Sequence, residues 1–245
     1  MCKVQRAIIM AAGLGNRMLP ITRTTPKPLV KIHGVRMIET AIDSLKMNQI
    51  DEIYVVVGHL KEQFLFLKDK YVGLNLIENP YYNTCNNISS LYVARDYIEN
   101  SIILDGDQII YNPNILNNEI IKSGYNSVWR DDYTNEWLQT VENDIVTSCS
   151  RVGGKGGWQL YSISRWTSED GKKLKKHLEI EFIDKKNTQI YWDDIPLFCY
   201  PKEYSLGIKE MDESDIVEID NIYELAKIDK SYEKYLLEVC DETEK

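Results

Sequence analysis

The stretch Ala7-Ile-Ile-Met-Ala-Ala-Gly-Leu-Gly-Asn-Arg-Met18 decides the fold of this chain. Its apolar first half, residues 7–12, predicts a strand that is buried on both faces. The strand ends at Gly13 and Gly15, where the chain can turn and a phosphate can approach bare backbone amides. The stretch therefore predicts a strand that leads directly into an anion-binding turn.

Two basic side chains accompany this turn. Arg17 follows the glycines at once, and Lys27 is held between Pro26 and Pro28. Backbone amides, a guanidinium and a lysine together suit a polyphosphate. The glycine spacing alone is a weak signal, because it is neither the dinucleotide fingerprint nor a P-loop. An ordinary strand–turn–helix remains the alternative for the glycine pair taken alone.

Strands and helices alternate through the first half of the chain. Apolar runs predict strands at 52–58, 74–78 and 101–107, and helical spacing predicts helices at 37–45, 60–71 and 88–99. This alternation predicts an α/β fold, with a Rossmann-like mixed, mostly parallel sheet flanked by helices. In such sheets the site lies at the carboxyl ends of the strands. The glycine turn and the pair Asp105 and Asp107 both fall at such ends.

The second half of the chain has a different texture. Shorter strands are predicted at 125–130, 137–141, 145–151 and 158–164, with a glycine-rich turn at 153–157. A lysine-rich helix at 167–178, an apolar strand at 216–220 and a charged amphipathic helix from 225 complete the prediction. We expect one domain over residues 1–245 with a β-rich second half. The acidic end at 240–245 could lead into a further module.

Composition excludes several classes of protein. The chain has 245 residues, a formal net charge of -9 and a pI near 5.0, which argues against sequence-independent nucleic-acid binding. No apolar run is long enough to span a bilayer, and no signal sequence is recognisable, so we expect no membrane insertion. Five scattered cysteines without a Cys-x-x-Cys pair predict reduced thiols in a cytoplasmic protein: Cys2, Cys85, Cys149, Cys199 and Cys240.

Two acidic pairs could serve a metal ion. Asp105 and Asp107 follow an apolar strand, and Glu218 and Asp220 lie on one face of a later strand. Mg²⁺ prefers a few carboxylate oxygens together with phosphate oxygens. For either pair alone, surface acids at a strand end are an equally good interpretation.

Two motifs in the right order resemble the signature of the nucleotidyltransferases that activate sugar and choline phosphates. These motifs are Ala11–Met18, which matches A-A-G-x-G-x-R-[LM], and Pro26–Val30, which matches P-K-x-[LM]-[VL]. The resemblance implies Mg²⁺ as cofactor with Asp107 and Asp220 as its ligands, and Asp105 and Glu218 as their neighbours. It also implies a nucleotide-binding half at 1–124 and an acceptor-binding half with the second metal motif at 125–245.

Within this family the chain is similar to the bacterial CTP:phosphocholine cytidylyltransferases over nearly its whole length. The similar segments are Val56–Phe64, Asn86–Tyr92, Thr134–Trp137 and Tyr191–Asp193. The resemblance implies catalytic roles for three residues: Lys27, Arg17 and Asp107. It implies nucleotide binding by a larger group: Ala11, Ala12, Gly13, Gly15, Gly58, Asn87, Ser90 and Asp105.

Aromatic residues in the second half have an independent physical meaning. A quaternary ammonium cannot donate an N–H hydrogen bond, so proteins usually hold it against the faces of Trp and Tyr. We expect an acceptor site from three rings and two nearby carboxylates: Trp137, Tyr191, Trp192, Glu136 and Asp193. The competing interpretation is that these rings belong to the core or to an interface.

The resemblance implies transfer of CMP from CTP to phosphocholine, which gives CDP-choline and pyrophosphate. 2-Aminoethylphosphonate and phosphoethanolamine are alternative acceptors, and a sugar 1-phosphate is a weaker one. An inactive nucleotide-sensing domain of the same fold is the alternative from another class. The expected partners are CTP and a small phosphorylated or phosphonate acceptor, with a fused or separate enzyme of the same pathway as a further option.

Overall fold

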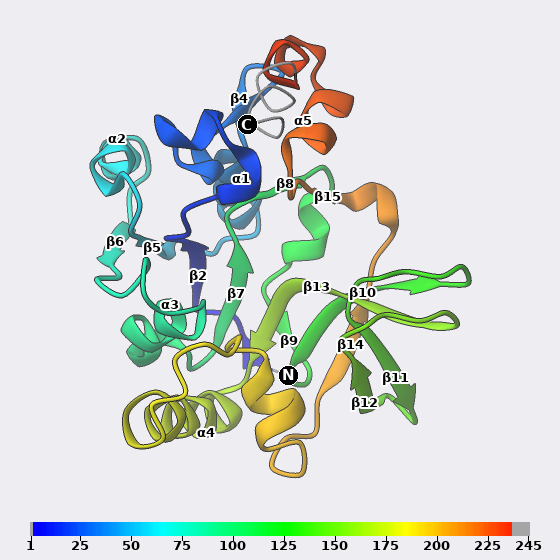
Figure 1. The fold of residues 1–245 in the computed structure, drawn as a ribbon. Coiled ribbons are helices and arrows are strands. Elements are labelled where there is room, and N and C mark those ends of the chain that lie inside the picture. Colours follow the sequence, from blue (N-terminus) through cyan, green and yellow to red (C-terminus); the bar gives the residue numbers. More distant parts are fainter. Residues whose placement is uncertain (1, 237–245) are drawn as a thin grey trace.

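A nine-stranded mixed sheet forms the centre of the molecule in the computed structural model, which describes residues 2–236 (Figure 1). The main strand order is β12-β11-β13-β7-β2-β5-β6, and β10 pairs with both β13 and β14. The strands are β2 (Arg6–Ala11), β5 (Glu52–Val57), β6 (Leu74–Glu78), β7 (Ser101–Asp105), β10 (Gly124–Arg130), β11 (Leu138–Glu142), β12 (Ile145–Ser150), β13 (Gly157–Trp166) and β14 (Gly207–Glu210).

The predicted opening strand lies in the middle of the parallel part of this sheet. β2 pairs in parallel with β5 on one side and with β7 on the other, and β6 continues the parallel set beyond β5. The chain moves outward from β2 to β5 and β6 and then returns to the other side of β2. The strand order therefore reverses between the neighbouring strands β2 and β7. Open α/β sheets bind their ligands beyond the carboxyl ends of the strands at such a topological switch point.

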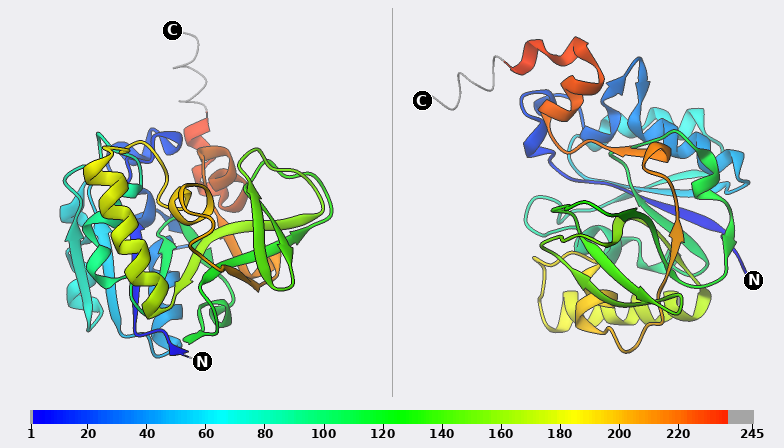
Figure 2. Two further views of the ribbon diagram at one scale, coloured as in Figure 1. Left: turned by 90° about the horizontal axis from the view of Figure 1, so that it is seen from below. Right: turned by 90° about the vertical axis from the view of Figure 1, so that its right-hand side faces the viewer.

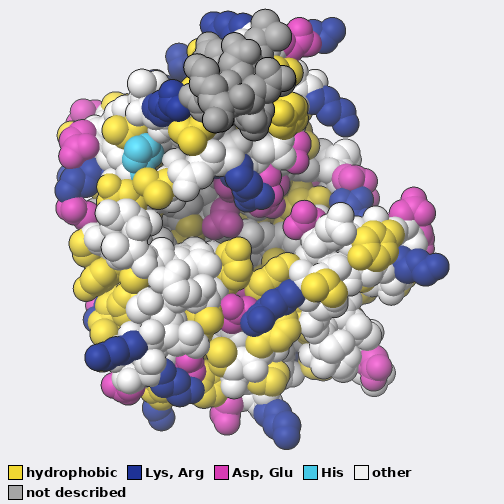
Figure 3. All heavy atoms as spheres, in the orientation of Figure 1, with side chains coloured by type: hydrophobic (Ala, Val, Ile, Leu, Met, Phe, Trp, Pro, Cys, Tyr) yellow, Lys and Arg dark blue, Asp and Glu magenta, His cyan; other side chains and the backbone are white. Residues whose placement is uncertain are grey.

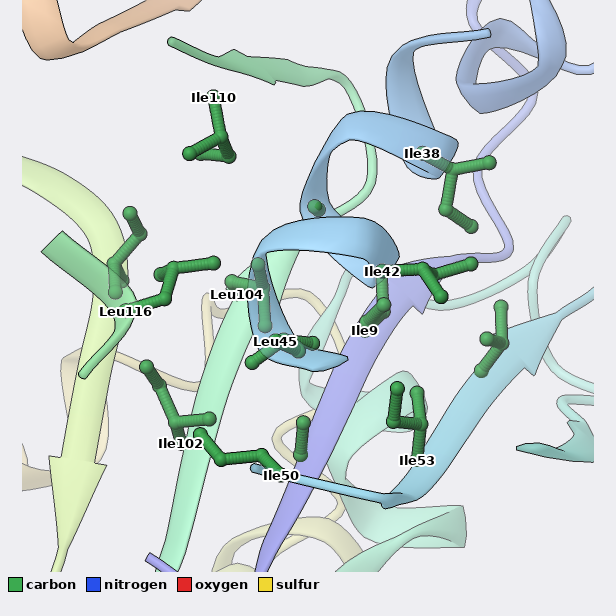
Figure 4. Close-up of a cluster of buried hydrophobic side chains, with 14 of the residues drawn as sticks. Ile9, Ile38, Ile42, Leu45, Ile50, Ile53, Ile102, Leu104, Ile110 and Leu116 are labelled. Carbon is green, nitrogen blue, oxygen red and sulfur yellow. The ribbon is translucent and has the colours of Figure 1, made fainter. Parts of the chain in front are cut away.

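Helices cover both faces of the sheet, as predicted. Helices α1 (Met37–Met47) and α2 (Phe66–Lys70) lie on one face, and α3 (Ile88–Val93) and α4 (Ser168–Glu179) lie on the other (Figure 2). Neighbouring residues of β2 alternate between the two layers. Ile9 packs with Ile42 and Leu45 of α1 (Figure 4), whereas Ile8 belongs to the cluster that contains Leu91 of α3. The α/β class predicted from the sequence is confirmed.

The β-rich second half extends the same sheet. β13 runs antiparallel to β7, β10 and β11 run antiparallel to β13, and β14 lies parallel to β10. The four short strands predicted between residues 125 and 164 are confirmed. One continuous sheet thus passes through residues 124 and 125, within β10, so the division into a nucleotide half and an acceptor half stays a functional prediction.

Short elements complete the described chain. β15 (Ile216–Glu218) pairs with β8 (Gln108–Ile110) and is followed by α5 (Ile222–Ile228). The remaining pairs are β1 (Cys2–Lys3) with β9 (Glu119–Ile120) and β3 (Lys31–Ile32) with β4 (Val35–Arg36). The β8–β15 pair matters for function, because it joins the two acidic motifs.

Three predicted helices differ from the structure. The span 60–71 holds a 3-10 turn at Lys61–Phe64 and then α2, and its first residue, Leu60, lies outside the helical part in a left-handed conformation with φ 50°. The span 88–99 holds α3, which ends at Val93 before a second 3-10 turn. The tail helix α5 begins earlier than predicted and ends at Ile228, and the carboxylate of the next residue, Asp229, caps the following 3-10 turn. The predicted acidic end at 240–245 lies outside the described residues.

Two expectations from composition can be compared with the described chain. Between residues 2 and 236, no helix combines the length and the apolar character that a bilayer span requires. Four cysteines in this part carry free thiols: Cys2, Cys85, Cys149 and Cys199.

Candidate active site

A cavity of about 370 Å³ opens at the carboxyl ends of β2 and β7. Figure 3 shows a hollow in the middle of this face, with acidic side chains inside it and basic side chains beside it. Most of the residues predicted to bind the nucleotide, to act in catalysis or to bind the metal line the cavity: Ala11, Ala12, Gly13, Gly15, Arg17, Lys27, Asn87, Ser90, Asp105, Asp107 and Asp220. The fold therefore gathers in one place residues that are up to about two hundred positions apart.

The glycine turn forms one wall of this cavity. Gly15 has φ 66°, and a Cβ atom there would lie 2.8 Å from Cγ2 of Thr22. The Thr22 hydroxyl donates a hydrogen bond of 2.9 Å to the Gly15 carbonyl. Gly13 differs, because no atom lies within 4 Å of the place where its Cβ would stand. Gly15 is thus required by the backbone, whereas Gly13 leaves open space above the end of β2.

Lys27 faces the acidic residues from a short 3-10 turn (Lys27–Leu29). Its Nζ atom lies 2.5 Å from Oδ2 of Asp107 and 3.3 Å from Oδ1 of Asp220. Burial alone would lower the pKa of Lys27, but the neighbouring carboxylates, with Asp107 first, raise it above its ordinary value. Lys27 is therefore a permanently charged group at the floor of the cavity.

Arg17 supplies a second positive charge at the rim of the cavity. Its NH2 and NH1 atoms lie 2.8 and 3.2 Å from the two carboxylate oxygens of Asp220. The Arg17 side chain is 69% exposed, whereas that of Lys27 is only 10% exposed. Arg17 can therefore turn toward a bound anion, while Lys27 is fixed in place.

The β8–β15 pair brings the two acidic motifs together. Asp107 precedes β8, and Glu218 lies opposite Gln108 in the pairing. The amide of Ile219 donates a hydrogen bond of 3.3 Å to the Asp107 carbonyl. As a result, one carboxylate oxygen from each of Asp107, Glu218 and Asp220 lies within 4.8 Å of the others.

These carboxylates could hold a metal ion. Oδ1 of Asp107 is buried and has no hydrogen-bond partner within the described chain. Burial and the charge of Asp107 raise the pKa values of both Asp105 and Glu218 well above their usual range. Unpaired, crowded carboxylate oxygens are the donor set that a hard cation such as Mg²⁺ prefers. The structure also adds Glu218 to the two ligands that the sequence predicted.

The opposite wall of the cavity includes residues that the sequence analysis missed. Asn79 and Tyr82 line it beside Asn87 and Ser90. The buried amide of Asn79 donates hydrogen bonds of 3.0 Å to the hydroxyls of Ser89 and Ser90. The position of Asn79 in the sequence could have indicated its role, because Asn79 directly follows the predicted strand at 74–78 and so lies at the carboxyl end of a strand.

Gly58 is the one predicted nucleotide-binding residue that does not line this cavity. A Cβ atom on Gly58 would lie 2.7 Å from the Tyr82 ring and 2.8 Å from the carbonyl of Ala12. The amide of His59 donates a hydrogen bond of 3.1 Å to the same carbonyl. Gly58 therefore acts through its neighbours, because its small size lets Tyr82 approach the end of β2.

A second cavity of about 310 Å³ adjoins the first and shares Arg17, Asn87 and the acidic residues with it. Four of the predicted acceptor residues line it: Glu136, Trp137, Tyr191 and Asp193. The Trp137 and Tyr191 rings meet edge to face, with their centroids 5.7 Å apart. This arrangement places two rings and two carboxylates next to the acidic cluster.

Trp192, the fifth predicted acceptor residue, lies elsewhere. It is 3% exposed and packs against Tyr125 and Trp166 in the core on the α3–α4 side. Its ring is not part of the cavity wall, although its backbone amide donates a hydrogen bond of 2.9 Å to Oδ1 of Asn87. Trp192 is therefore a core residue, which was the competing interpretation for these aromatic rings.

Asp193 is a buried carboxylate in the wall of the second cavity. It is 7% exposed, and its Oδ1 atom has no hydrogen-bond partner among residues 2–236. Burial, with a smaller contribution from the charge of Asp194, raises the pKa of Asp193 to about 7, although the neighbouring Tyr125 hydroxyl acts in the opposite direction. A cationic ligand in this cavity would favour the ionised form and supply the missing partner.

Arg151 supports the two rings from outside the cavity, and the sequence analysis missed it. Its NH2 atom lies 2.5 Å from Oδ1 of Asp194, whose Oδ2 accepts a hydrogen bond of 3.0 Å from the amide of Tyr191. Its guanidinium lies 4.0 Å from the Phe198 ring centroid and 5.7 Å from that of Trp137. Arg151 and Asp194 therefore hold the segment that carries Tyr191 against Trp137.

Comparison with known proteins gives consistent results. The family described as Nucleotidyl transferase matches residues 6–123. The chain is 35% identical to choline-phosphate cytidylyltransferase of Streptococcus pneumoniae, over 92% of this chain and 97% of that protein. It is 36% identical to 2-aminoethylphosphonate cytidylyltransferase of Lancefieldella rimae, over 94% of both chains.

A solved structure shows the same fold. The CTP:phosphocholine cytidylyltransferase of Streptococcus pneumoniae superposes with a TM-score of 0.86 at 34% identity, and the match covers 92% of this chain and 97% of that one.

Proposed function

This chain belongs to the nucleotidyl transferase family, and we propose that it transfers CMP from CTP to phosphocholine, releasing pyrophosphate. The observation that carries the proposal is the junction of two cavities at one acidic cluster. One cavity has the glycine turn and two cations, and the other has aromatic rings and carboxylates. A nucleoside triphosphate and a small cationic phosphate would thus meet at Asp107 and Asp220.

In this proposal the glycine turn, Arg17 and Lys27 bind the triphosphate. The amides around Gly13 and Gly15 would donate to phosphate oxygens, and Lys27 would neutralise charge that develops on the departing pyrophosphate. Arg17 would leave its contact with Asp220 and form a new contact with a phosphate group of the nucleotide. Ala11, Ala12 and the Asn87–Ser90 segment would recognise the base, with Asn79 holding the serine hydroxyls in place.

The acceptor phosphate would attack the α-phosphorus in line. Its oxygen is already anionic, so no general base is needed, and catalysis depends on positioning and charge neutralisation. A Mg²⁺ ion held by Asp107, Glu218 and Asp220 would supply positive charge to the phosphate oxygens. Lys27 would keep these carboxylates oriented through its contacts with Asp107 and Asp220.

The cationic end of the acceptor would lie in the second cavity. Trp137 and Tyr191 would contact the quaternary ammonium through their faces, each worth about 0.5–2 kcal/mol. Glu136 and Asp193 would add electrostatic attraction. The carboxylates of this cavity also disfavour acceptors without a cationic group, such as a sugar 1-phosphate, whose hydroxyl groups cannot compensate a buried negative charge.

A second candidate acceptor is 2-aminoethylphosphonate, and phosphoethanolamine shares its primary ammonium group. The unpartnered Oδ1 atom of Asp193 favours this alternative, because a primary ammonium could donate a hydrogen bond to it directly. A quaternary ammonium would contact the same carboxylate without a hydrogen bond. The relative from Lancefieldella rimae bears the corresponding name at similar identity.

A pyrophosphate-release assay separates these alternatives. The enzyme is incubated with CTP, Mg²⁺ and one acceptor from a panel of phosphocholine, phosphoethanolamine, 2-aminoethylphosphonate and glucose 1-phosphate. The proposal predicts the highest kcat/KM with phosphocholine. Release with the phosphonate alone would replace phosphocholine by the second candidate, and release with none would favour an inactive nucleotide-sensing domain.

A further inference from the structure

A third cavity lies away from the acidic cluster, where strands β10 and β14 begin. It has a volume of about 380 Å³ and shares no lining residue with the two cavities of the site. Arg165 of β13 lines it and pairs with Ile102 of β7, three residues before Asp105. Three residues of strand span about 10 Å, so this cavity is separate from the site.

Arg165 is a buried cation without a counter-charge. It is 4% exposed, and its guanidinium donates to Oδ1 of Asn126 at 2.5 Å and to the carbonyl of Ile115 at 2.6 Å. Burial lowers its pKa to about 10. Neutral acceptors satisfy part of the guanidinium, but they do not cancel its charge, and a buried unpaired charge is unfavourable.

Two lysines line the same cavity. Nζ of Lys209 donates to Oδ1 of Asn117 at 2.6 Å, and Nζ of Lys122 donates to the backbone carbonyl of Asp144 at 3.1 Å. Burial, followed by the charge of Arg165, lowers the pKa of Lys209 to about 7. The two lysines and Arg165 thus concentrate positive charge in a small volume.

Carboxylates do not neutralise this charge. Glu119 attracts Lys209 at longer range and partly offsets the lowering of its pKa, but neither Glu119 nor Asp144, which line the cavity and are exposed, forms an ion pair with the three cations. By contrast, Lys27 and Arg17 in the candidate active site both form ion pairs. Among the described residues, Arg165, Lys122 and Lys209 therefore surround one cavity without forming an ion pair, although the protein as a whole is acidic.

We infer that this cavity binds a small phosphate-class oxyanion between Lys122 and Lys209, above the Arg165 guanidinium. A dianion would supply the counter-charge that Arg165 lacks and would favour the charged form of Lys209. The volume falls in the range of small-molecule sites, so a phosphate ester as well as the free ion fits. The inference does not depend on the proposed acceptor or nucleotide.

Backbone amide NMR can test the inference at the site itself. Inorganic phosphate is added at constant ionic strength while the signals of Gly124 and Gly207, which line the cavity, are followed. The signals of Gly13 and Gly15, which line the candidate active site, are followed in the same spectra and report phosphate binding there separately. We expect saturable shifts of the Gly124 and Gly207 signals. A parallel titration with glucose 1-phosphate distinguishes the sources, because tighter binding of the ester indicates a phosphorylated metabolite and tighter binding of phosphate indicates the free ion.

Matched variants decide whether the cations are responsible. Lys122→Gln/Lys209→Gln should weaken phosphate binding at least tenfold, whereas Lys68→Gln/Lys202→Gln, which removes two exposed charges elsewhere, should bind as the wild type does. The dispersion of the amide spectrum reports whether each variant is folded, and Lys122→Gln alone serves if the double variant is not. Shifts that do not saturate, or equal affinity in both double variants, would overturn the inference.

Discussion

Arg17 and Asp220 form a two-point ion pair, with nitrogen–oxygen distances of 2.8 and 3.2 Å, although they are 203 residues apart in the sequence. The pair joins the glycine turn after β2 to the acidic motif after β15. Both halves of the proposed reaction, phosphate binding and metal binding, therefore meet at one contact.

Lys27→Met should reduce kcat by about two to three orders of magnitude, the usual effect of losing a group that neutralises developing charge. The matched control is Lys31→Met, which removes an exposed lysine four residues away. Steady-state kinetics with CTP and phosphocholine measure the effect, and the free energy of unfolding shows whether the buried methionine is tolerated. Near-normal turnover in a folded Lys27→Met would remove Lys27 from the mechanism.

Asp220→Asn should raise the Mg²⁺ concentration that gives half-maximal activity by about tenfold or more, because one of three clustered carboxylates is lost. Glu210→Gln removes an exposed carboxylate of the preceding strand β14 and serves as the control. Activity is measured against Mg²⁺ concentration at saturating substrates. An unchanged Mg²⁺ dependence in Asp220→Asn would show that this residue is not a metal ligand.

Trp137 and Trp192 should respond differently to mutation. Trp137→Leu should raise the KM for the cationic acceptor by about 2- to 30-fold, which corresponds to the loss of one cation–π contact. Trp192→Phe should lower the free energy of unfolding by about 1–3 kcal/mol and leave that KM nearly unchanged, because its ring lies in the core. A large KM effect in Trp192→Phe without loss of stability would contradict this assignment.

Arg151→Ala should raise the KM for the acceptor without changing the KM for CTP. The substitution leaves Asp194 without its cation and releases the segment that places Tyr191 against Trp137. Arg151→Lys should recover part of the loss, since a lysine can still pair with Asp194. Lys155→Ala, an exposed change in the adjacent turn, is the control. Equal changes in both KM values would argue against a positioning role.

Asp193 should make stability depend on pH in a defined direction. Its pKa is raised to about 7 in the folded protein and is near 3.9 in an unfolded chain. The folded state therefore holds this proton more tightly, and stability falls as pH rises from about 4 to 7. Asp193→Asn should remove this contribution, so the variant should gain stability relative to wild type between pH 5 and pH 8. The free energy of unfolding is measured by denaturant titration at several pH values. If it depends on pH in the same way in the wild type and in Asp193→Asn, the raised pKa of Asp193 is contradicted.

Much of the site followed from the sequence because its parts lie at strand ends. The family resemblance, and not the strand pattern, implied that Asp107 and Asp220 bind one metal ion, and the structure brings one carboxylate oxygen of each within 4.8 Å of the other. The β8–β15 pairing, which adds Glu218 to the cluster, could not be predicted, because three-residue strands carry too little pattern.

The acceptor side shows the limit of sequence reasoning. Tyr191 and Trp192 are adjacent and chemically alike, yet Tyr191 is 48% exposed and Trp192 is 3% exposed. They lie in an irregular segment before a π-helical turn, where neither helical nor strand periodicity assigns faces. Arg151 was missed for a related reason, since an arginine in the turn directly after a short strand gives no sign of the carboxylate that it will meet 43 residues later.

Oxygen labelling tests the central claim most directly. The enzyme is incubated with CTP, Mg²⁺ and phosphocholine that carries ¹⁸O in its three free phosphate oxygens, and the products are examined by ³¹P NMR and mass spectrometry. The account predicts CDP-choline with ¹⁸O in the bridging position between the two phosphorus atoms, and pyrophosphate without label. Label in pyrophosphate, or hydrolysis of CTP with no diphosphate product, would contradict direct attack of the acceptor on the α-phosphorus.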